Sequence, residues 1–199
     1  SGNETSILLV TFLSTLFLEL EFAIYIGVLL SLVLFLARTS TPEIVTLAPD
    51  VDTRANKNIL VDVSTKPLNQ CPQLKIIRVD MSIYFGSLNF IQSHLAKIVE
   101  QQRIHHILII GSGINFIDLS GAEMLATEAH RLEKLGGGLY FADLKPNVYE
   151  FLGKSHFVSD LGNTHFFDRK REALKFIYTK LDKEKCKGCT AEVFTECKQ

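Results

Sequence analysis

Residues 106–123 read HILIIGSGINFIDLSGAE, and this stretch decides the fold. Its first five residues are a short continuous apolar run, which is typical of a buried central strand. Gly111-Ser112-Gly113 interrupts the run, and apolar residues then recur at helical spacing from Ser120 to residue 135. A buried strand that leads through a turn into an amphipathic helix predicts a domain of the α/β class.

The sequence on either side of this stretch predicts a mixed β-sheet. Residues 74–80 (LKIIRVD) and 82–85 (SIYF) are two β-rich runs with almost nothing between them, so we expect a tight hairpin. The pattern then predicts, in order, a helix at 88–102, the strand at 106–110, a helix at 120–135, a strand at 139–143, a helix opened by Pro146, a strand at 164–167 and a helix at 168–183. The result is a mixed sheet of about five strands with four helices, in which 103–143 forms a right-handed parallel crossover.

The beginning of the chain predicts two short transmembrane helices. Residues 7–37 contain neither Lys nor Arg, and their only acidic residues are Glu19 and Glu21. These acids separate two apolar runs, 5–18 and 22–37, each shorter than the roughly 20 residues that a helix needs to cross a bilayer. Helices that cannot span alone are packed in a larger bundle, so we expect a parent protein longer than this chain.

Two other interpretations of these runs stay open. One long helix over 5–37 would place two carboxylates near mid-membrane, at roughly 2.5–3.5 kcal/mol each. The runs could also form a buried hydrophobic hairpin in a soluble protein. If they span a membrane, Arg38 favours a cytoplasmic location for the domain that follows.

Composition excludes some function classes. The formal net charge is -1, so no broad basic surface indicates a nucleic-acid partner. The six histidines show no metal-ligand spacing, and none accompanies a Ser or Cys in a nucleophile setting. We therefore expect no enzyme and no catalytic residues.

Four residues at the start of the central helix form the candidate site: Asp118, Ser120, Gly121 and Glu123. Ser120 and Glu123 stand at the spacing of a capping box, with Asp118 adding negative charge at the positive end of the helix. On this interpretation, Ser120→Ala would cost about 1 kcal/mol of stability through the lost cap. The functional alternative is an anion site or a phosphorylation switch at Ser120.

Four cysteines suggest a second candidate site. Their number is too small for a secreted disulfide scaffold, which favours a reducing compartment. Cys186 and Cys189, with Cys197, could bind zinc or an iron–sulfur cluster, the fourth ligand coming from Cys71 or from another chain. The alternative is a disordered tail whose thiols bind nothing.

Residues 117–121 (IDLSG), in their place between a strand and a helix, resemble the signature of the STAS domain. That domain is shared by bacterial anti-sigma-factor antagonists and by the cytoplasmic tails of sulfate permease (SulP) anion transporters. Residues 9–32 resemble the last two membrane helices of those permeases, and the segments 71–76 and 82–87 resemble the start of their STAS domain. The resemblance covers roughly residues 7–183.

The resemblance implies the C-terminal end of a secondary anion transporter for sulfate, bicarbonate or dicarboxylates. We therefore expect two transmembrane helices at 5–38, a linker at 39–73 with a short strand at 59–63, a STAS domain at 74–183 and a cysteine-containing tail at 184–199. The parent would be a multi-pass protein of the cell (inner) membrane. Its cytoplasmic STAS domain would regulate transport, assist folding or hold a homodimer. The expected partners are the remaining transmembrane domain and a cytosolic protein or a nucleotide near Ser120, but no nucleic acid.

A membrane-tethered signalling module of the antagonist type is the competing interpretation. In the antagonists, the phosphorylated serine directly follows the aspartate. Here Leu119 occupies that position and Ser120 comes second. Leucine has no hydroxyl group to phosphorylate, which disfavours a partner-switching cycle.

Overall fold

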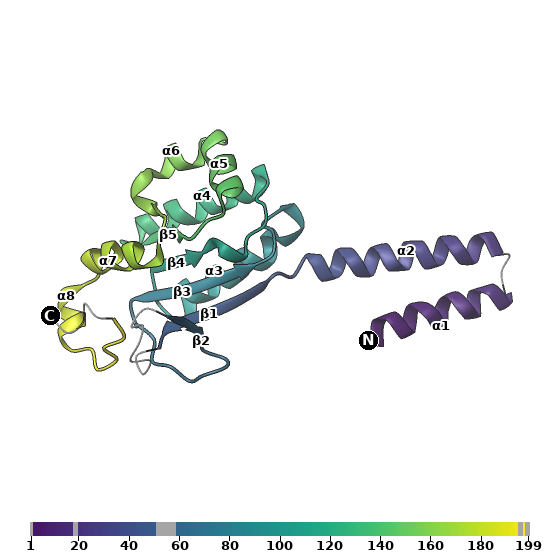
Figure 1. Cartoon of the computed structure of the whole chain (residues 1–199), viewed down its shortest axis with the longest axis horizontal. Coiled ribbons are helices and arrows are strands. Elements are labelled where there is room, and N and C mark those ends of the chain that lie inside the picture. The colour runs from purple at the N-terminus through teal and green to yellow at the C-terminus, as the bar shows by residue number, and fades with distance from the viewer. Residues whose placement is uncertain (1, 18–19, 51–58, 195–196, 198–199) are drawn as a thin grey trace. The chain divides into compact units, whose positions relative to one another are not determined.

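The computed structural model describes residues 2–17, 20–50, 59–194 and 197. The chain divides into two compact units, Ser1–Thr41 and Pro42–Gln199, which are drawn in Figure 1.

The first unit consists of two helices, α1 (Gly2–Phe17) and α2 (Leu20–Thr39), which pack against each other. Contact is close at Gly27, where an added Cβ would lie 3.0 Å from Oγ1 of Thr11. Large apolar side chains cover the outside of both helices, among them Leu8 and Val28. A helix pair with this surface is suited to lipid or to further apolar helices rather than to water.

The second helix is longer than the apolar run at 22–37 from which it was expected. By length and composition, the segment Glu21–Thr39 (19 residues) is long and apolar enough to cross a membrane. Helix α2 continues through the polar residues at its end, and the hydroxyl of Thr39 donates to the carbonyl oxygens of Phe35 and Leu36 at 3.1 Å. No second such helix occurs among the described residues. Of the turn expected at Glu19–Glu21, Glu19 lies outside the described residues, and Glu21 lies in the first turn of α2.

The second unit is built on a six-stranded mixed sheet with the strand order β2-β1-β3-β4-β5-β6. The strands are β1 (Glu43–Pro49), β2 (Leu60–Asp62), β3 (Leu74–Asp80), β4 (His106–Ile110), β5 (Gly138–Ala142) and β6 (Phe166–Phe167). Strand β1 runs antiparallel to both of its neighbours, whereas β3 to β6 are parallel. The predicted α/β class and the buried central strand at 106–110 are confirmed.

Helices cover both faces of this sheet (Figure 1). They are α3 (Leu88–Gln101), α4 (Leu119–Lys134), α5 (Pro146–Lys154), α6 (Phe157–Leu161), α7 (Lys170–Lys180) and α8 (Lys183–Lys187), with single 3-10 turns at Phe85–Ser87, Gly111–Gly113 and Asn163–His165. Alternate strand residues point to opposite faces, so Ile107 and Ile109 pack with α3 to α6, whereas Leu108 and Ile110 pack with α7. The sheet is thus the middle layer between two hydrophobic cores.

The predicted hairpin between 74–80 and 82–85 is wrong. Strand β3 pairs with β1, which comes from the segment expected to be a linker. Met81 follows β3 with a φ of 107°, and beyond it Ile83 makes only an isolated parallel bridge to Ile117. The short strand expected at 59–63 is confirmed as β2, so the sheet has six strands rather than five, and part of the expected linker belongs to the domain.

The place of β1 inside the sheet predicts a stability effect at Leu47, which lies in β1 and is only 5% exposed. Leu47→Ala should lower the free energy of unfolding by about 2–4 kcal/mol, because it removes a buried side chain from the core beside α7. The matched control is Ile59→Ala, just before β2, where the side chain is 42% exposed. Urea unfolding of the full chain in detergent measures both variants. A loss of stability in Leu47→Ala as small as that in Ile59→Ala would show that Leu47 does not belong to the core.

Candidate functional site

The candidate site lies where the chain leaves the carboxyl ends of β3 and β4. The segment after β3 turns through Phe85–Ser87 into α3, and the segment after β4 turns through Gly111–Gly113 toward α4. Backbone bonds hold the two segments together: the Ile83 amide donates to the Phe116 carbonyl at 3.0 Å, and the Asp118 amide donates to the Ile83 carbonyl at 3.1 Å. Both segments therefore arrive side by side at the start of α4.

The Asp118 carboxylate joins these segments a second time. Its Oδ1 accepts a hydrogen bond from the backbone amide of Gly121 at 2.7 Å, and its Oδ2 accepts one from the backbone amide of Phe85 at 3.0 Å. The first bond satisfies an amide that the helix itself leaves unpaired, and a negative charge is favourable at this end of a helix. One side chain thus caps α4 and fixes the turn after β3.

The capping box expected between Ser120 and Glu123 is wrong. The N-cap of α4 is Asp118, whose backbone is extended (φ -93°, ψ 176°), and the helix begins at Leu119. Ser120 is half-buried inside the first turn, and Glu123 is exposed further along the helix. Asp and Ser are both good N-caps, and the extended backbone at Asp118 decides between them.

Gly121 allows the close approach on which this arrangement depends. A Cβ at this position would lie 2.7 Å from the carbonyl oxygen of Ile83 and 3.0 Å from its Cγ2. Real Cβ atoms do not come so close to a backbone oxygen, so a larger residue would push α4 away from the turn after β3. Gly121 therefore belongs to the candidate site for a steric reason.

The surface around Asp118 is apolar. Phe85 is 77% exposed, Phe116 is 50% exposed and Leu119 is 57% exposed. All three lie within two residues of Asp118 or bond to it through the backbone. Exposed apolar groups beside a rigid turn are typical of surfaces that bind another protein. The position after Asp118 presents a leucine to this surface and offers no hydroxyl group.

The structure brings the cysteines to the opposite end of the sheet. Cys71 precedes β3, Cys186 lies in α8, and the Cys189 amide donates to the Cys186 carbonyl at 3.1 Å. Cys71, Cys186 and Cys197 all pack against the hydrophobic core beside α7. Burial raises the pKa of the Cys71 thiol above its ordinary value, bonds from the Gln73 and Leu74 amides lower it, and repulsion from the Cys197 and Cys189 thiolates raises it further. In the described part of the chain, no three His, Cys, Asp or Glu side chains already stand as a metal-binding group.

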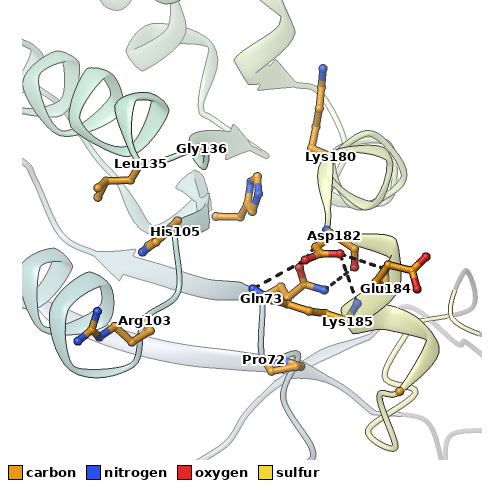
Figure 2. Close-up of a pocket in the computed structure, with 12 residues that line it drawn as sticks. Pro72, Gln73, Arg103, His105, Leu135, Gly136, Lys180, Asp182, Glu184 and Lys185 are labelled. Atoms are coloured by element: carbon orange, nitrogen blue, oxygen red, sulfur yellow. Dashed lines mark hydrogen bonds and ion pairs between the residues drawn. The ribbon is translucent and has the colours of Figure 1, made fainter.

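A cavity of about 560 Å³ adjoins this end of the sheet (Figure 2). Its walls come from Pro72-Gln73, from the segment before β4, from the turn after α4 and from the region of α7 and α8. Arg103, Lys180 and Lys185 are the cationic groups of this wall, whereas Asp182 and Glu184 are its acidic groups. Burial lowers the pKa of His106, which also lines it. Sequence reasoning missed this cavity because its walls come from four segments with no common motif.

The Asp118 geometry predicts different effects at two neighbouring positions. Asp118→Ala should lower the free energy of unfolding by about 1–2 kcal/mol, because it leaves the Gly121 and Phe85 amides without their acceptor. Ser120→Ala is the matched control and should change stability by no more than about 0.5 kcal/mol. Chemical denaturation of both variants makes the comparison. A loss at Ser120 as large as that at Asp118 would restore Ser120 as the cap.

The family model and the curated relatives that match this chain indicate the same family. The STAS domain family model matches residues 65–173. Sulfate transporter 1.1 of Arabidopsis thaliana is 27% identical over 166 residues, which are 78% of this chain and 25% of the relative. High affinity sulfate transporter 2 of Stylosanthes hamata is 26% identical over 166 residues, again 78% of this chain and 25% of the relative. The chain thus spans about a quarter of the length of these curated relatives.

The fold is also found in a solved structure. The murine anion transporter Slc26a9, in its inward-facing state, matches with a TM-score of 0.77 at 24% sequence identity, over 90% of this chain and 29% of that chain. This likeness concerns the fold, whereas the family model and the curated relatives concern the sequence itself. The chain belongs to the STAS domain family, and its domain is of the kind that SulP-type sulfate transporters carry.

Proposed function

We propose that this chain is the C-terminal part of a secondary anion transporter of the class that carries sulfate, bicarbonate or dicarboxylates. The observation that carries the proposal is the extent of the similarity. In sulfate transporters 1.2 and 1.3 of Arabidopsis thaliana it covers 87% of this chain, which is more than the unit Pro42–Gln199 can supply alone. The similarity therefore includes part of the helical unit as well as the STAS domain.

In this proposal the two helices are the end of a larger membrane domain. Helix α2 can span a bilayer, whereas α1 has 16 residues and is shorter than a typical span. Two helices cannot enclose a pathway for an ion, so the transport pathway lies in further helices of the parent protein. Arg38 in the last turn of α2 favours the cytoplasmic side of the cell membrane for the domain that follows.

The STAS domain then acts in regulation, folding or dimerisation rather than in transport itself. The Asp118 carboxylate accepts hydrogen bonds from two backbone amides, which gives it a structural role within the domain. The exposed side chains of Phe85, Phe116 and Leu119 offer a surface for a second protein or for a second copy of the domain. A nucleotide near Ser120 is a further partner in this proposal, lying beside the start of α4 rather than on the Gly121 amide, which Asp118 already occupies.

A membrane-tethered antagonist module is the alternative class of function. It requires a hydroxyl group that a kinase can modify at the position that follows Asp118. Leu119 occupies that position and is 57% exposed. A kinase-like partner that bound this surface would therefore find no hydroxyl group to phosphorylate at that position. We therefore favour the transporter.

The experiment is an uptake assay on the complete gene product that contains these residues. Proteoliposomes that hold the complete protein should take up labelled sulfate, bicarbonate or a dicarboxylate in a saturable manner. Proteoliposomes with residues 1–199 alone should take up none, because the pathway lies in other helices. Ser120→Ala in the complete protein should leave uptake unchanged, because Ser120 is not the helix cap.

Two results would contradict the proposal. One is a complete gene product that transports none of the three anion classes. The other is Ser120 phosphorylation in native cells that releases a bound partner, which would establish the signalling alternative. Mass spectrometry of the native protein detects that modification as a phosphopeptide within residues 116–131.

A further inference from the structure

The cavity of about 560 Å³ at the amino ends of β3 and β4 adjoins a second cavity. The second one has a volume of about 240 Å³ and is lined by residues of α4, β5 and α7, among others. His106, Gly136 and Lys180 line both, so the two adjoin and are called here the joint cavity. Sites for small molecules usually measure about 300–1,000 Å³, a range that includes the joint cavity.

Gln73 fixes the wall of the joint cavity that comes from the region of α8. Its side-chain Nε2 donates to the Asp182 carbonyl at 3.1 Å and to Sγ of Cys186 at 3.3 Å, and its Oε1 accepts from the Asp182 amide at 3.0 Å. Figure 2 shows Gln73 and Asp182 joined in this way. Because Asp182 is the N-cap of α8, the domain itself holds this wall in place. A cavity that is already formed is typical of small-molecule sites.

Two positive charges of the joint cavity are not balanced by its acidic groups at the α8 wall. Asp182 and Glu184 each pair with a lysine of α8, at 3.8 Å and 2.8 Å. In the part of the chain that the structure describes, no carboxylate pairs with Arg103 or Lys180. Figure 2 shows Arg103 and Lys180 on opposite sides of the drawn cavity. A ligand that pairs with both therefore needs two anionic groups with a body of its own between them.

His106 supplies a neutral hydrogen-bond donor to the same space. It is only 9% exposed, and its Nδ1 accepts a hydrogen bond of 3.5 Å from the Tyr140 hydroxyl. Burial, and then the charge of Glu133, raise the pKa of Tyr140 to about 12, so the phenol keeps its proton and is the donor. Burial, and then repulsion from His105, lower the pKa of His106, so its ring is neutral and carries its one proton on Nε2. Among the described residues Nε2 has no hydrogen-bond partner, which leaves it to donate to a ligand in the joint cavity.

We propose that the joint cavity binds a small dicarboxylate through Arg103 and Lys180. One carboxylate pairs with the guanidinium of Arg103, whose planar fork matches it in shape. The other pairs with the ammonium of Lys180 and accepts a hydrogen bond from Nε2 of His106, since these two residues line both cavities. The carbon chain between the carboxylates lies against the apolar side chains of Leu135 and Phe176, which line the first and the second cavity.

The site belongs to the STAS domain and is distinct from a transport pathway. A bound dicarboxylate connects the segment before β4, which carries Arg103, to the end of α7, which carries Lys180. The domain would thereby respond to the concentration of a metabolite. Binding is measured on this chain without any transport, so the result does not depend on which anion the parent protein carries.

The test is isothermal titration calorimetry on the full chain in detergent at low salt. Malonate, succinate, glutarate and adipate differ in the distance between their carboxylates. At least one of them should bind with a dissociation constant of about 1 mM or lower, the upper end of the range in which enzymes usually bind their substrates. Butyrate has one carboxylate and sulfate is a compact dianion, so each should bind at least about tenfold more weakly, the factor expected for one lost hydrogen bond to a charged group.

Variants test the assigned residues with the dicarboxylate that binds best. Arg103→Gln and Lys180→Gln should each weaken binding by about tenfold, because each removes a charged partner, and Lys180→Arg should retain most of it. His106→Phe keeps an aromatic ring beside Tyr140 and removes the Nε2 donor, so it should weaken binding by about threefold. The matched control is Lys175→Gln, which removes an exposed lysine of α7 that does not line the joint cavity and should leave binding unchanged. Far-UV circular dichroism checks that each variant is folded.

Several outcomes would overturn the proposal. They are an unmodified chain that binds none of the four dicarboxylates, butyrate or sulfate binding as tightly as the best dicarboxylate, and full binding in either Arg103→Gln or Lys180→Gln. Both of these side chains are exposed, so their replacement should not unfold the domain. A loss of binding in Lys175→Gln as large as that in Lys180→Gln would show a general effect of surface charge and contradict the site.

Discussion

The carboxylate of Asp118 connects the two segments that leave β3 and β4. A helix start leaves amides without partners, and a tight turn after a strand does the same. Asp118 satisfies one amide of each kind, those of Gly121 and Phe85, with its two oxygens. Because Gly121 has no side chain, α4 can approach the Ile83 carbonyl closely enough for both bonds to form. This interaction holds the start of α4 beside the turn after β3, where the side chains of Phe85, Phe116 and Leu119 are exposed.

The local patterns of the sequence predicted the elements that are continuous in the chain. Strand β4 is a run of apolar residues that ends at glycines, and α4 has helical spacing over its whole length. Strand β1 was missed because its partner β3 begins 25 residues after it ends, so no local pattern pairs the two strands, and because the segment 39–73 was expected to be a linker. The hairpin was predicted because the two β-rich runs are adjacent in the sequence. The sequence does not reveal that the backbone at Met81, between them, has a positive φ.

For the candidate sites too, local sequence patterns predicted some features, and others depend on the folded structure. Ser120 and Glu123 could be picked out by their spacing and Asp118 by its charge near the helix start, but the choice of Asp118 as the cap depends on the backbone conformation at that residue. The C-x-x-C pair was visible in the tail, and Cys71 was open as a fourth ligand. The side chain of Gln73 holds the tail beside the start of β3 through bonds to Asp182 and to the sulfur of Cys186, and the sequence around Gln73 has no recognisable motif. Interactions between residues more than 100 positions apart require the folded structure.

Amide hydrogen exchange at Phe85 tests the central role of Asp118 most directly. If the carboxylate holds both segments, Asp118→Ala should speed exchange at the amides of Phe85 and Gly121 together, since each loses its acceptor. The amide of Ile109, in the middle of β4, should remain as protected as before because the sheet does not depend on this bond. Faster exchange at Gly121 with no change at Phe85 would show that Asp118 is only a helix cap, and would contradict this account.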